Sequence, residues 1–243
     1  MTVLGSDPVF RPVGDAAIRV SFGGGEAGPA VRAWCARLSA VEVPGVIEWV
    51  PAYTTVTVHY RPLEIGFEDL VDRLRALPPT VEARTADTVR LLVLPVRYGG
   101  ERGPDLPFVS ATAGLTEAEV IARHCAPLYR VEMIGFSPGF PYLSGMDPAL
   151  AAPRLERPRM LVPAGSVGIA GTQTGVYSIA TPGGWRILGR TPVKLFDPTA
   201  DPVSLLAAGD GLRFRSVDEE TFREIERGVA AGTYHPEWLE ADP

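Results

Sequence analysis

The sequence predicts a mixed α+β protein built from two consecutive domains. Strand-like and helix-like hydrophobic patterns alternate through the first third of the chain. Short apolar runs, interrupted by Gly and Pro every few residues, then fill residues 130–215, which favours an all-β barrel. Between these regions, the polar stretch "ARTADT" at residues 83–88 is typical of a linker. A chain of 243 residues, 46% of them apolar, can form one large or two small domains.

The first domain, residues 1–86, is predicted to have the order βαββαβ. In residues 16–22, Ile18, Val20 and Phe22 fall on one face of a strand. A helix pattern follows from about Pro29, with apolar residues at i, i+3, i+4 and i+7. The remaining elements are expected as strands at 46–50 and 54–60, a helix at 66–77 and a last strand at 80–84. This order is that of the ferredoxin-like split motif.

The second domain, residues 87–243, is predicted to be the barrel with a C-terminal helix. A strand pattern begins at Val89 and runs into a loop rich in Gly and Pro. One helix follows, because Thr116 and Glu119 match a capping box. After the barrel, a last helix is expected from about Ser216 to Val229, with Glu219 as its capping partner, followed by a tail that is loose or lies on a neighbour.

Composition and charge exclude several classes of protein. A net charge of −6 argues against nucleic acid as the main partner, because binding phosphates needs a basic face. The chain shows no apolar run of membrane-spanning length and no secretory signal, so we expect a cytoplasmic protein. Two cysteines make no disulfide framework, and no two of the three histidines have metal-ligand spacing, so no metal site is predicted.

Loops rich in Gly, Pro and Arg are the candidates for function. "GFSPGFPYLSG" at residues 135–145 is either a structural corner or a binding loop. "PRLERPR" at residues 153–159 is either a solvated loop or an anion site that prolines stiffen. "GWRILGRT" at residues 184–191 departs from a P-loop, because Arg190 replaces the lysine and Pro192 follows where a helix should start. Arg190 remains a candidate for binding an anion.

Three further residues have a structural and a functional interpretation. Ser166, in "PAGSVG", is a turn serine or part of a nest of backbone N–H groups for an anion. Trp185 is a core residue or a platform for a cofactor. His124, near the end of a helix, interacts with the helix dipole or acts as a general acid or base. The residues alone indicate a pocket for an anion or a small molecule.

Taken as an ordered set, the loops carry a resemblance. "GFSPGFPYL", "PRLERPR", "VPAGSVGIAG", "GVYS", "PGGWRILGRTP" and "LFDP" closely resemble the KipI/PxpB family, that of the B-type subunit of 5-oxoprolinase, also called allophanate hydrolase subunit 1. "GDAAIRVSFG", "VPAYTTVTVHY" and "LPVRYGGERGPDL" fit the N-terminal half of that family. The resemblance extends from about Gly14 to Pro198.

The resemblance implies a ferredoxin-like domain followed by a cyclophilin-like β-barrel. It also implies a subunit, inactive alone, of an ATP-dependent 5-oxoprolinase that converts 5-oxoproline to glutamate. The implied partners are a second barrel subunit of the KipA/PxpC type and a subunit of the LamB/YcsF (PxpA) type. The implied cofactors are ATP and Mg²⁺, held mainly by the partners or shared with them.

Two other classes of function stay open. Some family members resemble inhibitors of sensor histidine kinases, which would make the chain a regulatory binding protein. In urea-degrading enzymes the same pair of subunits is fused to a biotin-dependent carboxylase, which would make it a subunit associated with allophanate hydrolysis or urea amidolyase. A prolyl isomerase activity is not favoured, because a fold does not carry a function.

An oxoprolinase site must hold a substrate carboxylate and the phosphate chain of ATP. We expect His124, Arg159 and Arg190 to be the catalytic residues. Backbone N–H groups for developing oxyanion charge are expected at Gly135, Gly139, Gly165, Ser166 and Gly184. The walls of the pocket are expected to be Phe136, Phe140, Tyr142 and Trp185. Further candidates for binding substrate or nucleotide are Pro138, Arg154, Pro163, Gln173, Tyr177 and Thr191.

Overall fold

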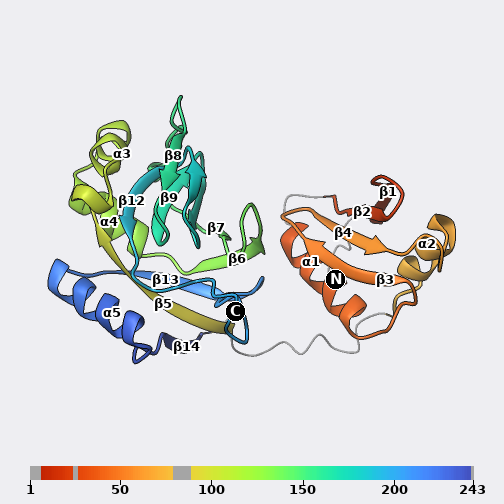
Figure 1. Ribbon diagram of the computed structural model, residues 1–243. Coiled ribbons are helices and arrows are strands. Elements are labelled where there is room, and N and C mark those ends of the chain that lie inside the picture. Colours follow the sequence, from red (N-terminus) through yellow and green to blue (C-terminus); the bar gives the residue numbers. More distant parts are fainter. Residues whose placement is uncertain (1–6, 24–26, 79–88, 242–243) are drawn as a thin grey trace. The chain divides into compact units, whose positions relative to one another are not determined.

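The computed structural model describes residues 7–23, 27–78 and 89–241, and the chain divides into two compact units, residues 1–87 and 88–243 (Figure 1). Each unit has a hydrophobic core of its own. The division falls among residues 79–88, outside the described residues, so the predicted boundary at residue 86 and the linker at 83–88 stay predictions. Within the described ranges, no helix combines the length and the apolar character that crossing a bilayer requires.

Unit 1 packs two helices against a four-stranded antiparallel sheet of order β1-β2-β4-β3. Its elements are β1 (Val9–Pro12), β2 (Ala17–Ser21), α1 (Ala27–Ser39), β3 (Val46–Pro51), β4 (Thr55–Tyr60) and α2 (Phe67–Arg75). Strand β4 buries every second residue, including Val56 and Val58, against the apolar faces of the helices. On α1 that face includes Trp34, and on α2 it includes Leu70.

The predicted order of unit 1 is confirmed from β2 to α2. Strand β1 was not predicted, because its four residues are mostly exposed and show no alternating pattern. It pairs with the free edge of β2, where the last strand of a ferredoxin-like motif would lie. The predicted strand at 80–84 falls outside the described residues, so a ferredoxin-like domain is not confirmed.

Unit 2 is a closed barrel of seven strands, which confirms the predicted barrel. Its strands are β5 (Val89–Tyr98), β6 (Tyr129–Ile134), β7 (Pro141–Ser144), β9 (Ser166–Ala170), β10 (Gln173–Val176), β12 (Arg186–Arg190) and β13 (Gly211–Ser216). They follow the order β12-β9-β10-β7-β6-β13-β5, and a β12–β5 pairing closes the ring. Two short strands, β8 (Arg159–Val162) and β11 (Thr181–Gly183), form a separate ribbon. The more specific cyclophilin-like description stays an implication of the resemblance.

The helices of unit 2 correct the prediction in two places. Two helices, α3 (Leu106–Ala113) and α4 (Glu117–Cys125), lie between β5 and β6 where one was expected, although the capping box of α4 is confirmed. The last helix is α5 (Glu219–Ala231), and Asp218, not Ser216, caps it by accepting a hydrogen bond from the N–H of Thr221 at 2.8 Å. Glu219 is therefore free to point elsewhere. Two short 3₁₀ turns lie at Gly100–Arg102 (η1) and Pro148–Leu150 (η2).

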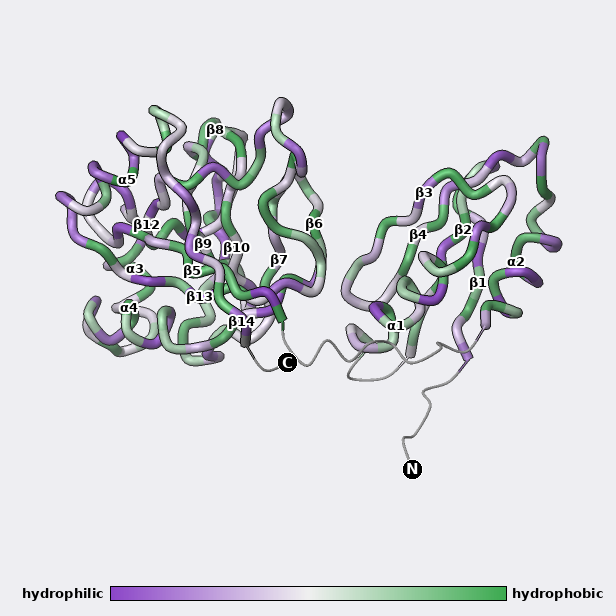
Figure 2. Tube along the Cα trace, turned by 90° about the horizontal axis from the view of Figure 1, so that it is seen from below, coloured by the Kyte–Doolittle hydropathy of each residue, from purple (hydrophilic) through white to green (hydrophobic). Residues whose placement is uncertain are grey.

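The C-terminal tail is also ordered differently from the prediction. Strand β14 (Glu237–Ala241) pairs antiparallel with β5, so this part of the tail is neither loose nor dependent on a neighbour. In Figure 2, long green stretches follow the barrel strands, whereas α2 alternates between purple and green as an amphipathic helix does. The barrel core includes Leu92, Val131 and Leu212, all fully buried. This core supports the loops in which the candidate residues lie.

Candidate functional site: two cavities of the barrel

One cavity of unit 2 has a volume of about 510 Å³, and half of its lining residues are charged. We call it the arginine cavity; its charged residues are Arg97, Glu101, Arg102, Arg159, Arg190, Glu219 and Arg223. The end of β5, η1, β8, β9, β12 and the first turns of α5 contribute to it, so segments far apart in the sequence build it. Of the predicted site residues, it contains Arg159, Pro163, Ser166 and Arg190.

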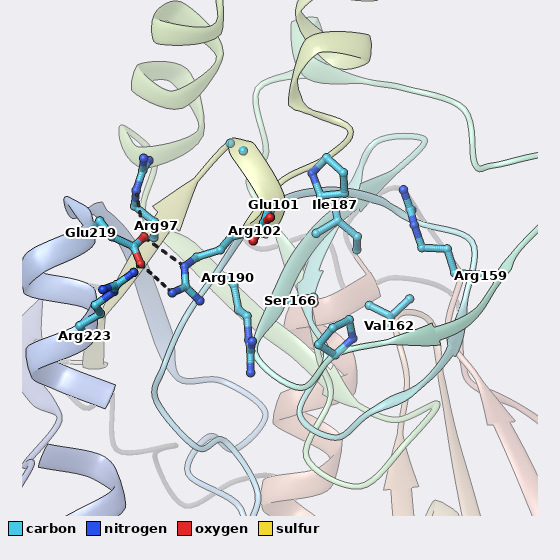
Figure 3. Close-up of a pocket in the computed structure, with 14 residues that line it drawn as sticks. Arg97, Glu101, Arg102, Arg159, Val162, Ser166, Ile187, Arg190, Glu219 and Arg223 are labelled. Atoms are coloured by element: carbon cyan, nitrogen blue, oxygen red, sulfur yellow. Dashed lines mark hydrogen bonds and ion pairs between the residues drawn. The ribbon is translucent and has the colours of Figure 1, made fainter. Parts of the chain in front are cut away.

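On one side of the arginine cavity, arginines surround a single carboxylate, that of Glu219 (Figure 3). Oε1 of Glu219 lies 2.9 Å from Nη2 of Arg102 and 2.9 Å from Nε of Arg223. Arg97 lies further away, with its Nε 3.7 Å from Oε2. Hydrogen bonds from Arg102 and Arg223 lower the pKa of Glu219 to about 2, so this carboxylate is ionised at neutral pH.

On the other side, a buried carboxylate neutralises Arg159. Nη1 of Arg159 lies 2.9 Å from Oδ2 of Asp105, and Nη2 donates a hydrogen bond to Oδ1 at 3.0 Å. Asp105 also accepts a hydrogen bond from the backbone N–H of Ile187 at 2.7 Å. The same carboxylate therefore fixes both Arg159 and the start of β12. Because Arg159 has this partner, its charge is largely committed to the fold.

Arg190 lies between these two groups in Figure 3 and has no carboxylate partner among the described residues. Its Nε donates a hydrogen bond to the backbone oxygen of Ala164 at 2.9 Å, which fixes the side chain in the cavity. Gly165, at a φ of +82°, lets this turn approach β12 closely, because a Cβ there would lie 2.1 Å from the backbone oxygen of Thr191. Arg190 is thus held in place with its charge available to an anion.

A second cavity has a volume of about 250 Å³, and half of its lining residues are aromatic. We call it the aromatic pocket; its lining is Phe136, Phe140, Tyr142, Arg154, Pro158, Tyr177, Pro182, Gly183, Gly184 and Trp185. Phe140 is the central ring, with centroid distances of 4.9 Å to Tyr142, 5.3 Å to Tyr177 and 5.4 Å to Trp185. Tilted and edge-to-face packing of this kind stabilises aromatic clusters. Seven predicted site residues meet here.

The turn between β6 and β7 contains most of the glycine-rich stretch at residues 135–145. This turn positions Phe136 at the aromatic pocket with a φ of +67°, the one non-glycine residue in the described chain with a positive φ. Gly139 makes the turn possible, because a Cβ there would lie 2.7 Å from the Cβ of Phe196. The hydroxyl of Ser178 also donates a hydrogen bond to the backbone oxygen of Pro138. A strained, exposed aromatic residue on a fixed turn is typical of a binding loop.

The tyrosines of the aromatic pocket keep their protons at neutral pH. Burial raises the pKa of Tyr177, and a hydrogen bond from the backbone of Trp185 and the charges of Arg154 and Arg159 only partly oppose it. Burial also raises the pKa of Tyr142, against the charge of Arg154. Both hydroxyl groups can therefore act as hydrogen-bond donors.

His124 lies in the barrel core and lines neither cavity, which contradicts its predicted catalytic role. Its Nδ1 lies 2.8 Å from the hydroxyl of Tyr98, and its Nε2 lies 3.0 Å from the hydroxyl of Thr174. Because the Thr174 hydroxyl donates to the backbone oxygen of Gly168, it must accept from His124, which assigns the proton to Nε2. The ring stacks on Phe214 with centroids 4.5 Å apart, and burial lowers the pKa of His124 to about 3.

Three predicted oxyanion donors are already engaged, which corrects their predicted role. The N–H of Gly135 donates to the oxygen of Phe140 at 3.1 Å, that of Gly165 to Tyr177 at 2.7 Å and that of Ser166 to Pro163 at 3.2 Å. The remaining candidates outside both cavities are Pro138, Gly139, Gln173 and Thr191. Pro138 and Gly139 shape the turn, and the Thr191 hydroxyl accepts a hydrogen bond from the N–H of Val193.

Six charged residues of the arginine cavity and its support were not predicted from the sequence: Arg97, Glu101, Arg102, Asp105, Glu219 and Arg223. The signal for Asp105 was present, since it follows a Gly/Pro turn, but its partners lie 54 and 82 positions away. Glu219 was predicted to be the capping partner of the last helix, so a role in a cavity was not considered for it. Only the three-dimensional structure brings these residues together.

Comparisons with known proteins identify the family of the chain. A family model described as "Carboxyltransferase domain, subdomain C and D" matches residues 8–206. The B-type subunit of 5-oxoprolinase from Bacillus subtilis (strain 168) is 41% identical over 230 residues, which are 88% of this chain and 94% of that protein.

Two solved structures extend the comparison. The structure of TTHA0988 matches with a TM-score of 0.73 and 39% identity over 83% of this chain, which spans only 40% of that longer chain. Kluyveromyces lactis urea carboxylase matches with a TM-score of 0.79 over 96% of this chain and 24% of its own, at 19% identity, which shows likeness of fold alone. Together with the family model, the Bacillus relative establishes that the chain belongs to the PxpB family, that of the B-type subunit of 5-oxoprolinase.

Proposed function

We propose that the chain is one subunit of an ATP-dependent 5-oxoprolinase, which opens 5-oxoproline to glutamate. The observation that carries this proposal is the arginine cavity, found in a chain whose relatives are named as the B-type subunit of 5-oxoprolinase. Five arginines line it, whereas Glu101, Glu219 and the supporting Asp105 are the carboxylates near them. This excess of positive charge suits a phosphate chain.

Within the cavity, Arg190 is the residue we assign to a phosphate oxygen, because no carboxylate of the described residues compensates its charge. Arg102 and Arg223 are held by Glu219 at the other side, so they present N–H groups in a fixed orientation. ATP, when bound, supplies the phosphoryl group that makes the unreactive lactam carbonyl electrophilic. The arginines position that phosphate chain and stabilise its charge.

The residues of the arginine cavity do not by themselves fit Mg²⁺. In the described ranges, no three His, Cys, Asp or Glu side chains gather closely enough to hold a metal ion. Of the two carboxylates that line the cavity, Glu219 is engaged by arginines. We therefore assign no step of the reaction in this chain to a metal.

A partner subunit of the KipA/PxpC type and one of the LamB/YcsF type complete the proposed enzyme. The matched family model covers subdomains C and D of a carboxyltransferase domain, and TTHA0988 is more than twice as long as the part matched here. The β8–β11 ribbon supports a docking role, because Met160 is 85% exposed and Leu161 is 64% exposed. Arg159, at the start of the same ribbon, lines the arginine cavity.

The proposal is tested by following ATP hydrolysis that depends on 5-oxoproline, together with glutamate formation. The chain is assayed alone and in a complex purified with both partner subunits. We expect activity in the complex only, and Arg190→Gln should lower kcat/KM for ATP by about 10- to 100-fold, the effect of losing one charged hydrogen bond.

The matched control is Arg213→Gln, which removes an exposed arginine of β13 outside both cavities. This control should leave kcat/KM unchanged. A complex of all three subunits that forms no glutamate would contradict the enzymatic proposal and favour a regulator of a histidine kinase.

A further inference from the structure

We infer that the aromatic pocket is the site for a small five-membered lactam that carries a carboxylate, with Arg154 binding that carboxylate. This inference rests on the proposed function, for which 5-oxoproline is the substrate. It goes further by assigning the lactam to a cavity other than the arginine cavity and by naming the residues that recognise each part of it.

The size and lining of the aromatic pocket suit this ligand. Its volume of about 250 Å³ lies below the roughly 300–1,000 Å³ of pockets for drug-sized ligands. Phe140, Tyr177 and Trp185 are almost fully buried, so these three walls are held by the core. A compact ring with CH₂ groups can pack against such faces and edges.

Arg154 supplies the one charge that lines this pocket. Its guanidinium carbon lies 6.0 Å from the centroid of the Trp185 ring, and no carboxylate pairs with it among the described residues. Arg159 and Arg186 differ in this respect, because both lie near the carboxylate of Asp105. The charge of Arg154 is thus available to an incoming carboxylate, which a guanidinium can bind through two parallel hydrogen bonds.

The lactam group itself finds a donor in Tyr177. Tyr177 lines the pocket, and burial raises the pKa of its hydroxyl group, so the hydroxyl oxygen keeps a proton that it can donate to a ligand. Gly183 allows this arrangement, because a Cβ there would lie 2.3 Å from that oxygen. The lactam carbonyl oxygen is the acceptor we assign to it. A ring bound by its carboxylate at the rim and its carbonyl at the wall has one orientation.

The aromatic pocket adjoins the arginine cavity. Pro158 lines the aromatic pocket and the next residue, Arg159, lines the arginine cavity. In the same way, Trp185 and Ile187, at the start of β12, line one cavity each. Nη1 of Arg159 also donates a hydrogen bond to the backbone oxygen of Trp185 at 3.5 Å, so a residue of one cavity contacts a residue of the other. The proposed lactam and phosphate sites are therefore neighbours.

The first test measures binding of 5-oxoproline to the full chain by tryptophan fluorescence, with 2-pyrrolidinone, which lacks the carboxylate, as the comparison ligand. We expect 5-oxoproline to change the fluorescence of the wild type and not that of Trp185→Phe. Arg154→Gln should weaken the binding of 5-oxoproline by about 10- to 100-fold and leave the affinity for 2-pyrrolidinone unchanged. The matched control Arg157→Gln, an exposed arginine of the same loop outside both cavities, should bind both ligands as the wild type does.

The second test uses the active three-subunit complex and separates this inference from the proposed function. Arg154→Gln should raise KM for 5-oxoproline by a similar factor and leave KM for ATP unchanged, whereas Arg190→Gln should do the reverse. An active complex in which Arg154→Gln leaves KM for 5-oxoproline unchanged would overturn the inference while the proposed function stands. A complex without any activity would instead overturn the proposed function on which it rests.

Discussion

Replacing His124 by Gln tests whether this residue stabilises the hydrophobic core, as its burial indicates. In the folded chain its pKa is about 3, compared with 6.5 for a free histidine. Between these two pH values the unfolded chain binds one more proton than the folded chain, so the free energy of unfolding falls as the pH falls. The slope is about 1.4 kcal/mol per pH unit. When the pH falls from 6.5 to 4.5, His124 should therefore lower the free energy of unfolding of the wild type by about 3 kcal/mol.

The assay is urea unfolding of the wild type and His124→Gln at pH 7.5, 6.5, 5.5 and 4.5. Other titrating groups, Glu219 among them, affect both proteins equally, so the difference between the two curves isolates His124. At neutral pH we expect the wild type to be more stable, because the ring stacks on Phe214 and bonds Tyr98 and Thr174. That advantage should shrink by about 3 kcal/mol at pH 4.5. Two parallel stability curves would refute the reasoning.

Two other substitutions test how the cavities are supported. Gly183→Ala should destabilise the chain by about 1–3 kcal/mol, because the new Cβ would overlap the buried Tyr177. Its control, Gly184→Ala, should leave the stability unchanged, because the Cβ there would meet Pro158 at an ordinary distance of 3.6 Å. Equal melting temperatures of the two variants would contradict this prediction. Asp105→Asn should cost about 2–3 kcal/mol in urea unfolding, because it removes the buried partner of Arg159. Its control, Glu64→Gln, breaks an exposed ion pair with Arg61 and should change the free energy of unfolding by less than about 1 kcal/mol. If the two substitutions lowered the stability equally, the burial of Asp105 would add nothing to the strength of its ion pair.

The elements that the sequence predicts well are those specified by local periodicity. Strand β4 buries every second residue, and α4 starts at a capping box whose two hydrogen bonds are both present. The strands that were missed depend on pairing with another strand. Strand β14 exists because β5 offers it an edge, and β1 exists because β2 does. The sequence of a short exposed segment does not indicate that the free edge of another strand lies nearby.

The same contrast between local signals and contacts with other parts of the chain applies to the candidate site. The loops with Gly, Pro and aromatic residues were found, because special backbone conformations leave a signal in residue type. The sequence could not show that Arg154 and Arg190 belong to different cavities, since this depends on how the β8–β11 ribbon and β12 fold. Nor could it show that His124 is buried, because its helix exposes some faces and covers others.

The start of α5 shows how one position decides the chemistry of the arginine cavity. Glu219 would be an ordinary capping residue if the helix began at Ser216, and its carboxylate would then be committed to the backbone. Because Asp218 caps the helix, Glu219 lies in the first turn and meets Arg102 and Arg223. Its negative charge holds these arginines in place before any anion arrives, which reduces the cost of ordering them on binding. A phosphate chain then meets a preorganised cluster, with Arg190 free to complete it.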